Sequence, residues 1–152
     1  MEIFNFIKNN SINQIEQFIH NGGDINATNN LGYTPLMAAL LVKNNKDIIH
    51  LLIDNGADVH AKDKYGIMPL MQALLDKTDK DIIQLLLNNG ADVNAIDNDG
   101  DTPLIFALLG KNDKDIIQLL LDNGANDVLE TLKEKLKESD YKTEMLLFID
   151  EY

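Results

Sequence analysis

The chain has 152 residues, of which 45% are hydrophobic and 25% are charged, a balance typical of one folded domain and not of a disordered segment. It contains no cysteine, which excludes disulfides, thiolate catalysis and cysteine-ligated zinc sites. The formal net charge is −12 and all 13 cationic residues are lysines, so the surface repels polyanions and we expect no nucleic-acid binding.

The start of the chain gives no sign of targeting to a membrane. No apolar run approaches the roughly 18 residues that a membrane span needs, and the first residues lack the basic-then-apolar order of a signal peptide. We therefore expect a cytoplasmic, monomeric protein that makes no membrane contact. The absence of cysteine is compatible with a cytosolic protein but also with an exported one.

Two short helices are predicted first, from Ile3 to Asn9 and from Ile12 to His20. They lack the Thr-Pro-Leu start that recurs further along the chain. Because the end of a stack of repeats must cover the hydrophobic core, residues 1–29 are predicted to form an N-terminal capping unit.

A period of 34 residues organises the next part of the chain. It is marked by three independent sets of residues: Gly22, Gly56, Gly90 and Gly124; Pro35, Pro69 and Pro103; and the Asp-Ile-Ile triplets that begin at Asp47, Asp81 and Asp115. Such a period indicates stacked supersecondary units. We predict full repeats at residues 30–63, 64–97 and 98–125.

Each repeat is predicted to hold two helices and an extended finger loop. In the first full repeat, the first helix begins at Pro35, where proline is well tolerated, and runs to about Lys43. Asn45 is predicted to cap the second helix. Gly56 supplies the left-handed residue after that helix, and residues 57–63 form the finger. The corresponding caps of the next two repeats are Asp79 and Asp113.

Beyond Gly124 the finger motif is absent, and residues 126–152 are predicted to form a C-terminal helical cap. Apolar residues recur at helical spacing there, namely Val128, Leu129, Leu132 and Leu136, followed by Met145, Leu146, Phe148 and Ile149. The alternative is that the Leu-Phe-Ile segment docks into a partner.

The segment that begins Gly32-Tyr33-Thr34-Pro35-Leu36 and the Asn-Gly-Ala-Asp-Val corner at Asn55, with their later copies, resemble ankyrin repeats. The resemblance covers residues 1 to about 125. It implies an all-α solenoid of stacked helix-turn-helix pairs with finger loops, which binds a protein partner through its concave face. The repeats depart from the family pattern at several positions: its usual histidine is replaced by Met37, Met71 and Ile105, its threonine by Met68, and one extra residue lies near Asn44, Thr78 and Asn112.

No arrangement of residues predicts a catalytic or metal site, so we expect no enzyme activity and no cofactor. The histidines, His20, His50 and His60, show no metal-ligand spacing, and neither serine, Ser11 or Ser139, has a histidine nearby. The acidic run at residues 97–101 is not an EF-hand loop, because aligning Gly100 with its invariant glycine places Ala95 and Phe106 at ligand positions.

The resemblance implies that the binding residues lie on the fingers and first helices. Residues that differ between repeats at equivalent positions are free of a shared packing constraint, and aromatic residues are common in binding hot spots. The predicted protein-binding residues are Tyr33, Lys64, Tyr65, Ile67, Gln72, Asp99, Asp101 and Phe106. Leucine recurs at one position of each repeat, and Leu41, Leu75 and Leu109 are therefore expected to be core residues. Met37, Met71 and Ile105 are expected to pack between repeats.

The leading hypothesis is a non-enzymatic protein–protein interaction module. One alternative is an acidic immunity or inhibitor protein that neutralises a basic toxin or nuclease, since a compact chain of charge −12 suits a basic partner. Another is a scaffold with no specific partner. The sequence does not identify the partner.

Overall fold

The computed structural model describes residues 2–43, 45–76, 78–110 and 112–125, and within them the chain is helical with no strand. The predicted C-terminal cap, residues 126–152, lies outside the described residues. The helices are α1 (Glu2–Lys8), α2 (Ile12–His20), α3 (Pro35–Leu40), α4 (Lys46–Asp54), α5 (Pro69–Leu75), α6 (Lys80–Asn88), α7 (Pro103–Leu109) and α8 (Lys114–Asp122). The predicted all-α repeat solenoid is confirmed.

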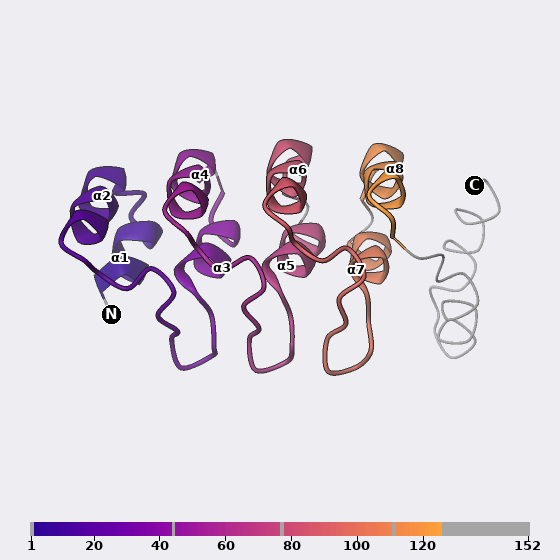
Figure 1. Cartoon of the computed structure of the whole chain (residues 1–152), viewed down its shortest axis with the longest axis horizontal. Helices are drawn as coiled ribbons and strands as arrows, with labels where there is room; N and C mark the ends of the chain where they lie inside the picture. The colour runs from indigo at the N-terminus through magenta and orange to yellow at the C-terminus, as the bar shows by residue number, and fades with distance from the viewer. Residues whose placement is uncertain (1, 44, 77, 111, 126–152) are drawn as a thin grey trace.

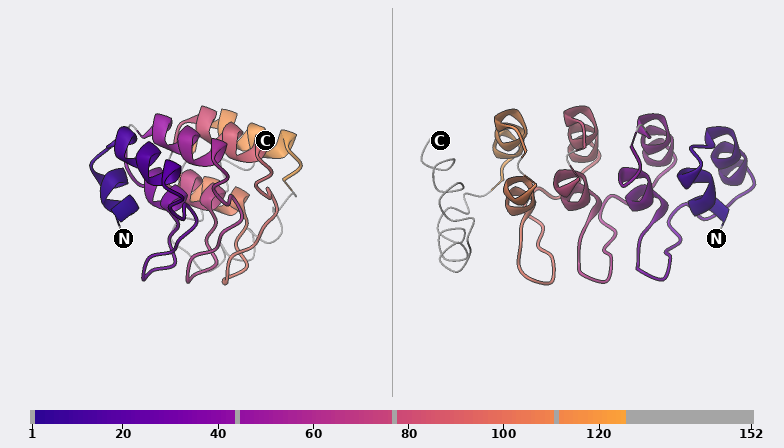
Figure 2. Two further views of the ribbon diagram at one scale, coloured as in Figure 1. Left: turned by 60° about the vertical axis from the view of Figure 1, so that its left-hand side comes forward. Right: turned by 180° about the vertical axis from the view of Figure 1, so that it is seen from behind.

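The helices pair and stack into two rows (Figure 1). The odd-numbered helices form an inner row, in which α1 contacts α3, α3 contacts α5 and α5 contacts α7, and each inner helix packs against the even-numbered helix that follows it. A long finger loop precedes α3, α5 and α7. The fingers leave the inner row on the side away from the outer helices, as all views show (Figures 1 and 2).

The inner helices begin where the sequence predicts. Pro35 lies in the first turn of α3, and the Thr34 hydroxyl accepts a hydrogen bond from the Met37 amide at 3.3 Å. This cap satisfies a backbone donor that the helix itself cannot. Thr102 caps α7 in the same way. At the start of α5 stands Met68, which makes no cap hydrogen bond and is instead buried in the core.

The first of these helices is shorter than predicted. It ends at Leu40, not near Lys43, because the chain tightens after Ala39: the Val42 amide donates to the Ala39 carbonyl, three residues back, at 3.2 Å. Such i→i−3 bonds commonly close a helix end.

The outer helices begin at the predicted positions, but without the predicted side-chain caps. Asn45, Asp79 and Asp113 each hold the N-cap position of their helix, and none of the three side chains makes a cap hydrogen bond. The Asp79 carboxylate instead lies 2.8 Å from the Lys46 amine. The Asn45 side chain is turned inward and only 2% exposed. The position of a polar residue therefore predicted the helix start but not the contact of its side chain.

One continuous hydrophobic core runs through the stack. Met37, Met71 and Ile105 are at most 3% exposed, as expected for residues that pack between repeats. The prediction for the recurring leucines is wrong, because Leu41, Leu75 and Leu109 are 45%, 43% and 52% exposed. The recurrence of leucine at one position of the repeat therefore does not indicate that this position is buried.

Candidate functional site

The finger loops are held in shape by one side chain each. In the finger between α4 and α5, an oxygen of Asp63 accepts hydrogen bonds from the amides of Tyr65 at 2.8 Å and Ile67 at 2.9 Å. The Asp63 amide donates to the Ile67 carbonyl at 3.0 Å. Asn29 and Asp97 play the same part in the other two fingers. Such local side-chain bonds fix a tight turn without regular secondary structure.

Neighbouring fingers are bonded to each other at their tips. The Asn98 amide donates to the Tyr65 carbonyl at 3.0 Å, and the Asn98 side chain donates to the Lys64 carbonyl at 3.1 Å. The Lys64 amide donates to the Leu31 carbonyl at 3.4 Å. Gly66 permits this approach, since a Cβ atom there would lie 2.8 Å from the Asn98 nitrogen. The three tips therefore form a preorganised row.

We call the surface made by the fingers and the uncovered side of α3, α5 and α7 the finger–helix face. Four of the predicted binding residues lie in the fingers and differ in exposure. Tyr65 is 65% exposed at its tip, Lys64 and Asp99 are exposed, and Asp101 is half-buried. The tip position of Tyr65 is occupied by Leu31 in the preceding finger and by Asp99 in the next, so the three tips are aliphatic, aromatic and acidic.

Tyr33 and Ile67 are half-buried at the point where each finger joins its inner helix. Burial raises the pKa of the Tyr33 phenol above its usual value, and the negative charges of Asp63 and Asp76 and the neighbouring Tyr65 raise it further. The phenol of Tyr33 therefore senses the negative charge of Asp63 in the next finger and of Asp76 after the next inner helix.

Two of the predicted binding residues lie inside the molecule. Gln72 and Phe106 are each 6% exposed, and Phe106 belongs to the hydrophobic core. They occupy the position held by Ala38 in the preceding repeat. Variation between repeats at this position therefore reflects different packing and not exposure.

Sequence reasoning missed two contributors to the face. The first is the row of exposed leucines described above. The second is Asp76, an exposed residue whose carboxylate accepts a hydrogen bond from the side-chain amide of Gln72. Val42 and Gly110 hold its position in the other repeats, so the same criterion of variation could have singled out Asp76.

Two grooves open where the inner helices turn into the outer ones. One, of about 310 Å³, lies between the first two full repeats and is lined by Leu41, Asn45, Lys46, Asp76 and Asp79 among others. The hydrogen bond that the Lys46 amine donates to the Asp79 carboxylate raises the pKa of Lys46. The next, of about 350 Å³, lies between the second and third full repeats and includes Asp79, Lys80, Asp113 and Asp115. The first groove carries Lys43 and Lys46 beside its two aspartates, whereas three aspartates and one lysine line the second.

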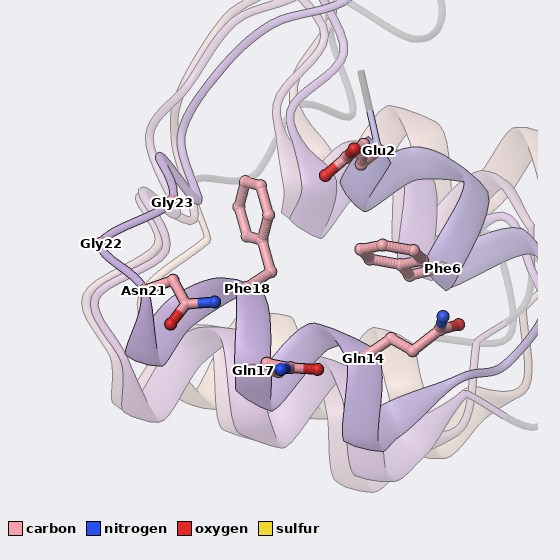
Figure 3. A pocket seen from close by; sticks show the side chains of 8 residues that line it. All are labelled: Glu2, Phe6, Gln14, Gln17, Phe18, Asn21, Gly22 and Gly23. Atoms are coloured by element: carbon pink, nitrogen blue, oxygen red, sulfur yellow. The ribbon is translucent and has the colours of Figure 1, made fainter.

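A third pocket, of about 310 Å³, lies at the N-terminal end of the stack. Phe6 and Phe18 border it together with the polar side chains of Glu2, Gln14 and Gln17 (Figure 3). The residues that line this pocket belong to α1, to α2 and to the turn that follows α2.

Neither a cluster of metal-binding side chains nor a membrane-spanning helix occurs among the described residues. No three histidine, aspartate or glutamate side chains among them are placed to hold a metal ion, and His20, His50 and His60 are all exposed. No described helix is long and apolar enough to span a bilayer.

A family model described as ankyrin repeats (3 copies) matches residues 3–97 and 40–131. A search of curated proteins returned no match. The helix pairs, the bonded fingers and this match agree, and the chain belongs to the ankyrin-repeat family.

Proposed function

We propose that this chain is a non-enzymatic module that binds a protein partner across the finger–helix face. Ankyrin repeats are in general protein–protein interaction modules. The observation that carries the choice of surface is where the large exposed hydrophobic side chains lie among the described residues. All six are in the fingers or at the ends of the inner helices, and none is on an outer helix: Leu31, Leu41, Tyr65, Leu75, Ile96 and Leu109.

Exposed apolar side chains gathered on one face favour association, because binding removes them from water. The bonds within and between the fingers support the same proposal. A surface that is already ordered loses little conformational freedom on binding. The aromatic ring of Tyr65 is suited to anchor the partner, whereas Asp99 and Asp101 are suited to steer its approach.

The test requires a partner recovered from the native source by pulldown. Tyr65→Ala should weaken binding of that partner by about 2 kcal/mol or more, chiefly through faster dissociation. Asp99→Asn combined with Asp101→Asn should slow association, and added salt should shrink the difference. The control is Gln118→Ala on outer helix α8, where the side chain is exposed. If Gln118→Ala abolishes binding while Tyr65→Ala does not, the proposed face is wrong.

Phe106 is a poor probe of binding because it is buried. Truncation to alanine leaves a cavity that costs about 3 kcal/mol or more of stability. A loss of binding by Phe106→Ala therefore has to be judged beside its melting temperature.

A second function, neutralisation of a basic toxin or nuclease, is favoured by the net charge of −12. The genes next to the one that encodes this chain distinguish a toxin-neutralising protein from an adaptor. A purified basic toxin encoded beside this chain should lose its activity when the chain is added in equal amount. Full toxin activity in the presence of the bound chain would favour an adaptor.

A further inference from the structure

Each outer helix of the stack ends at an asparagine that is followed by glycine. These asparagines come directly after the last residue of α2, α4, α6 and α8: Asn21, Asn55, Asn89 and Asn123. An asparagine before glycine can lose its side-chain nitrogen as ammonia, because glycine has no side chain to keep its backbone nitrogen away from the neighbouring carboxamide. The four pairs are therefore candidate modification sites, beyond the part that the glycines play in ending the helices.

The four pairs have the same backbone surroundings. Each glycine has a positive φ, between +77° at Gly22 and +89° at Gly90. Each glycine amide also donates a hydrogen bond to the carbonyl three residues earlier, at 2.9 or 3.0 Å. All four asparagines are exposed. The backbone therefore gives no reason for one pair to react sooner than another.

The asparagine side chains differ. In Asn55, Asn89 and Asn123, the side-chain nitrogen donates a hydrogen bond to the carbonyl four residues earlier, at 2.8, 2.9 and 2.8 Å. This bond restricts the rotation that brings the side-chain carbonyl carbon to the glycine nitrogen. The Asn21 side chain makes no hydrogen bond with any other described residue. It lines the pocket at the N-terminal end of the stack instead (Figure 3).

We propose that Asn21-Gly22 is a deamidation site and reacts before the three other asparagine–glycine pairs. The Gly22 backbone nitrogen gives its proton to hydroxide and attacks the side-chain carbonyl carbon of Asn21. A bond forms between these two atoms, the bond from the same carbon to the side-chain nitrogen breaks, and that nitrogen takes up a proton and leaves as ammonia. Water then opens the succinimide ring, and the product is aspartate or isoaspartate.

The products disturb a tight turn. The Gly23 amide donates to the Phe18 carbonyl at 2.9 Å, and a Cβ atom on Gly23 would collide with the Phe18 ring. Isoaspartate adds a carbon atom to the main chain of this turn. Both products also place a negative charge at the C-terminal end of α2, where the helix dipole disfavours it. Because Ile15 of α2 is part of the core, we expect the N-terminal unit to lose stability as the reaction proceeds.

The test incubates the full chain in mildly alkaline buffer, both folded and unfolded in guanidinium chloride. Cleavage after lysine then separates the four pairs into the peptides 9–43, 47–62, 81–111 and 115–133. Tandem mass spectrometry measures the conversion of each asparagine. In the folded chain Asn21 should convert about fivefold faster than the other three, because their side-chain hydrogen bond must open first. In guanidinium chloride the four rates should be similar.

The inference fails if Asn21 converts no faster than Asn55, Asn89 or Asn123 in the folded chain. It also fails if Asn21 leads by the same ratio in guanidinium chloride, since the local sequence and not the fold would then be the cause.

The effect on the turn is tested with Asn21→Gln, because the longer glutamine side chain closes the corresponding ring far more slowly. Each protein is compared with its own fresh sample after equal incubation. The melting temperature of the wild type should fall, and that of Asn21→Gln should stay unchanged. An equal fall in both would overturn the proposed effect of Asn21 on the N-terminal unit.

Discussion

At the scale of single residues, the glycines of this chain do two different things. Gly90, at the end of an outer helix, has φ +89° with only the His60 ring near a would-be Cβ atom. Gly66, at a finger tip, has φ +80° and is also pressed against Asn98 of the next finger. Gly90 is required only because its φ angle is positive. Gly66 is required for the same reason and also because a side chain there would prevent the contact between two fingers.

Gly66→Ala should therefore destabilise the protein more than Gly100→Ala. Both glycines are finger-tip residues with φ near +80°, so each substitution carries a backbone cost of about 1 kcal/mol. Only at Gly66 does the new methyl group meet a described backbone atom, the Asn98 nitrogen at 2.8 Å, and displace its hydrogen bond to the Tyr65 carbonyl. We expect about 1 kcal/mol of additional loss, measured by urea denaturation. Equal losses would show that the finger-to-finger bond contributes nothing.

Tyr33 makes the stability depend on alkaline pH. Its pKa is raised in the folded protein above the usual value of about 10, so the folded state holds this proton more tightly than the unfolded state. The resulting stabilisation is fully present below the unfolded pKa and is lost as pH rises through the folded pKa. The free energy of unfolding of the wild type, relative to that of Tyr33→Phe, should therefore fall above about pH 10. A difference that does not change with pH would contradict this account of Tyr33.

At the scale of the helices, the inner and outer rows begin by different means. α3 and α7 have a threonine whose hydroxyl accepts a hydrogen bond from the first turn. The outer helices have an asparagine or aspartate at the same position without such a bond. Their stability comes from the packing of their apolar sides, as is common for short helices.

Replacement of the two kinds of cap should reveal this difference. Thr34→Ala removes the acceptor of the Met37 amide at a site only 1% exposed, and should cost about 1 kcal/mol. Asp113→Ala removes an exposed carboxylate that makes no cap bond, and should cost less than about 0.5 kcal/mol. Thermal melting followed by circular dichroism measures both. A larger loss in Asp113→Ala would mean that the outer helices depend on their N-cap side chains after all.

At the scale of the whole molecule, each unit buries its apolar surface against its neighbours. The core residues of α7, including Ile105 and Ala107, are covered within the stack, and the first repeat is covered by Ile3, Ile7 and Ile15 of the N-terminal pair. In such a protein the end units determine whether the exposed side of the last repeat meets water.

Residues 126–152 are predicted from the sequence to form a C-terminal cap, and their deletion should then lower the melting temperature or the solubility of the chain sharply, because the last unit of a repeat stack cannot bury its outer face alone. The full chain should show a strongly helical circular dichroism spectrum, and the deletion should reduce the cooperativity of unfolding. If the truncated chain melts like the full one, the segment is not a cap, and its docking into a partner becomes the better hypothesis.

The sequence by itself determined the repeat, its period and the starts of its helices, since these depend on local chemistry. Proline fits only the first turn of a helix, threonine at the N-cap accepts the bond of a nearby amide, and glycine allows a positive φ. The glycines at Gly22, Gly56, Gly90 and Gly124 have the left-handed conformation that their spacing predicts.

The tertiary structure alone decided which side chains the face presents. Leu75 and Phe106 are both apolar residues of inner helices, yet one is 43% and the other 6% exposed. The difference depends on where each helix ends and on which neighbour covers each side, and neither follows from the identity of a residue. Asp76 likewise gained its place in the candidate site from the tertiary structure, since Gln72 donates a hydrogen bond to its carboxylate and it lines the same groove as Leu41 of the preceding repeat.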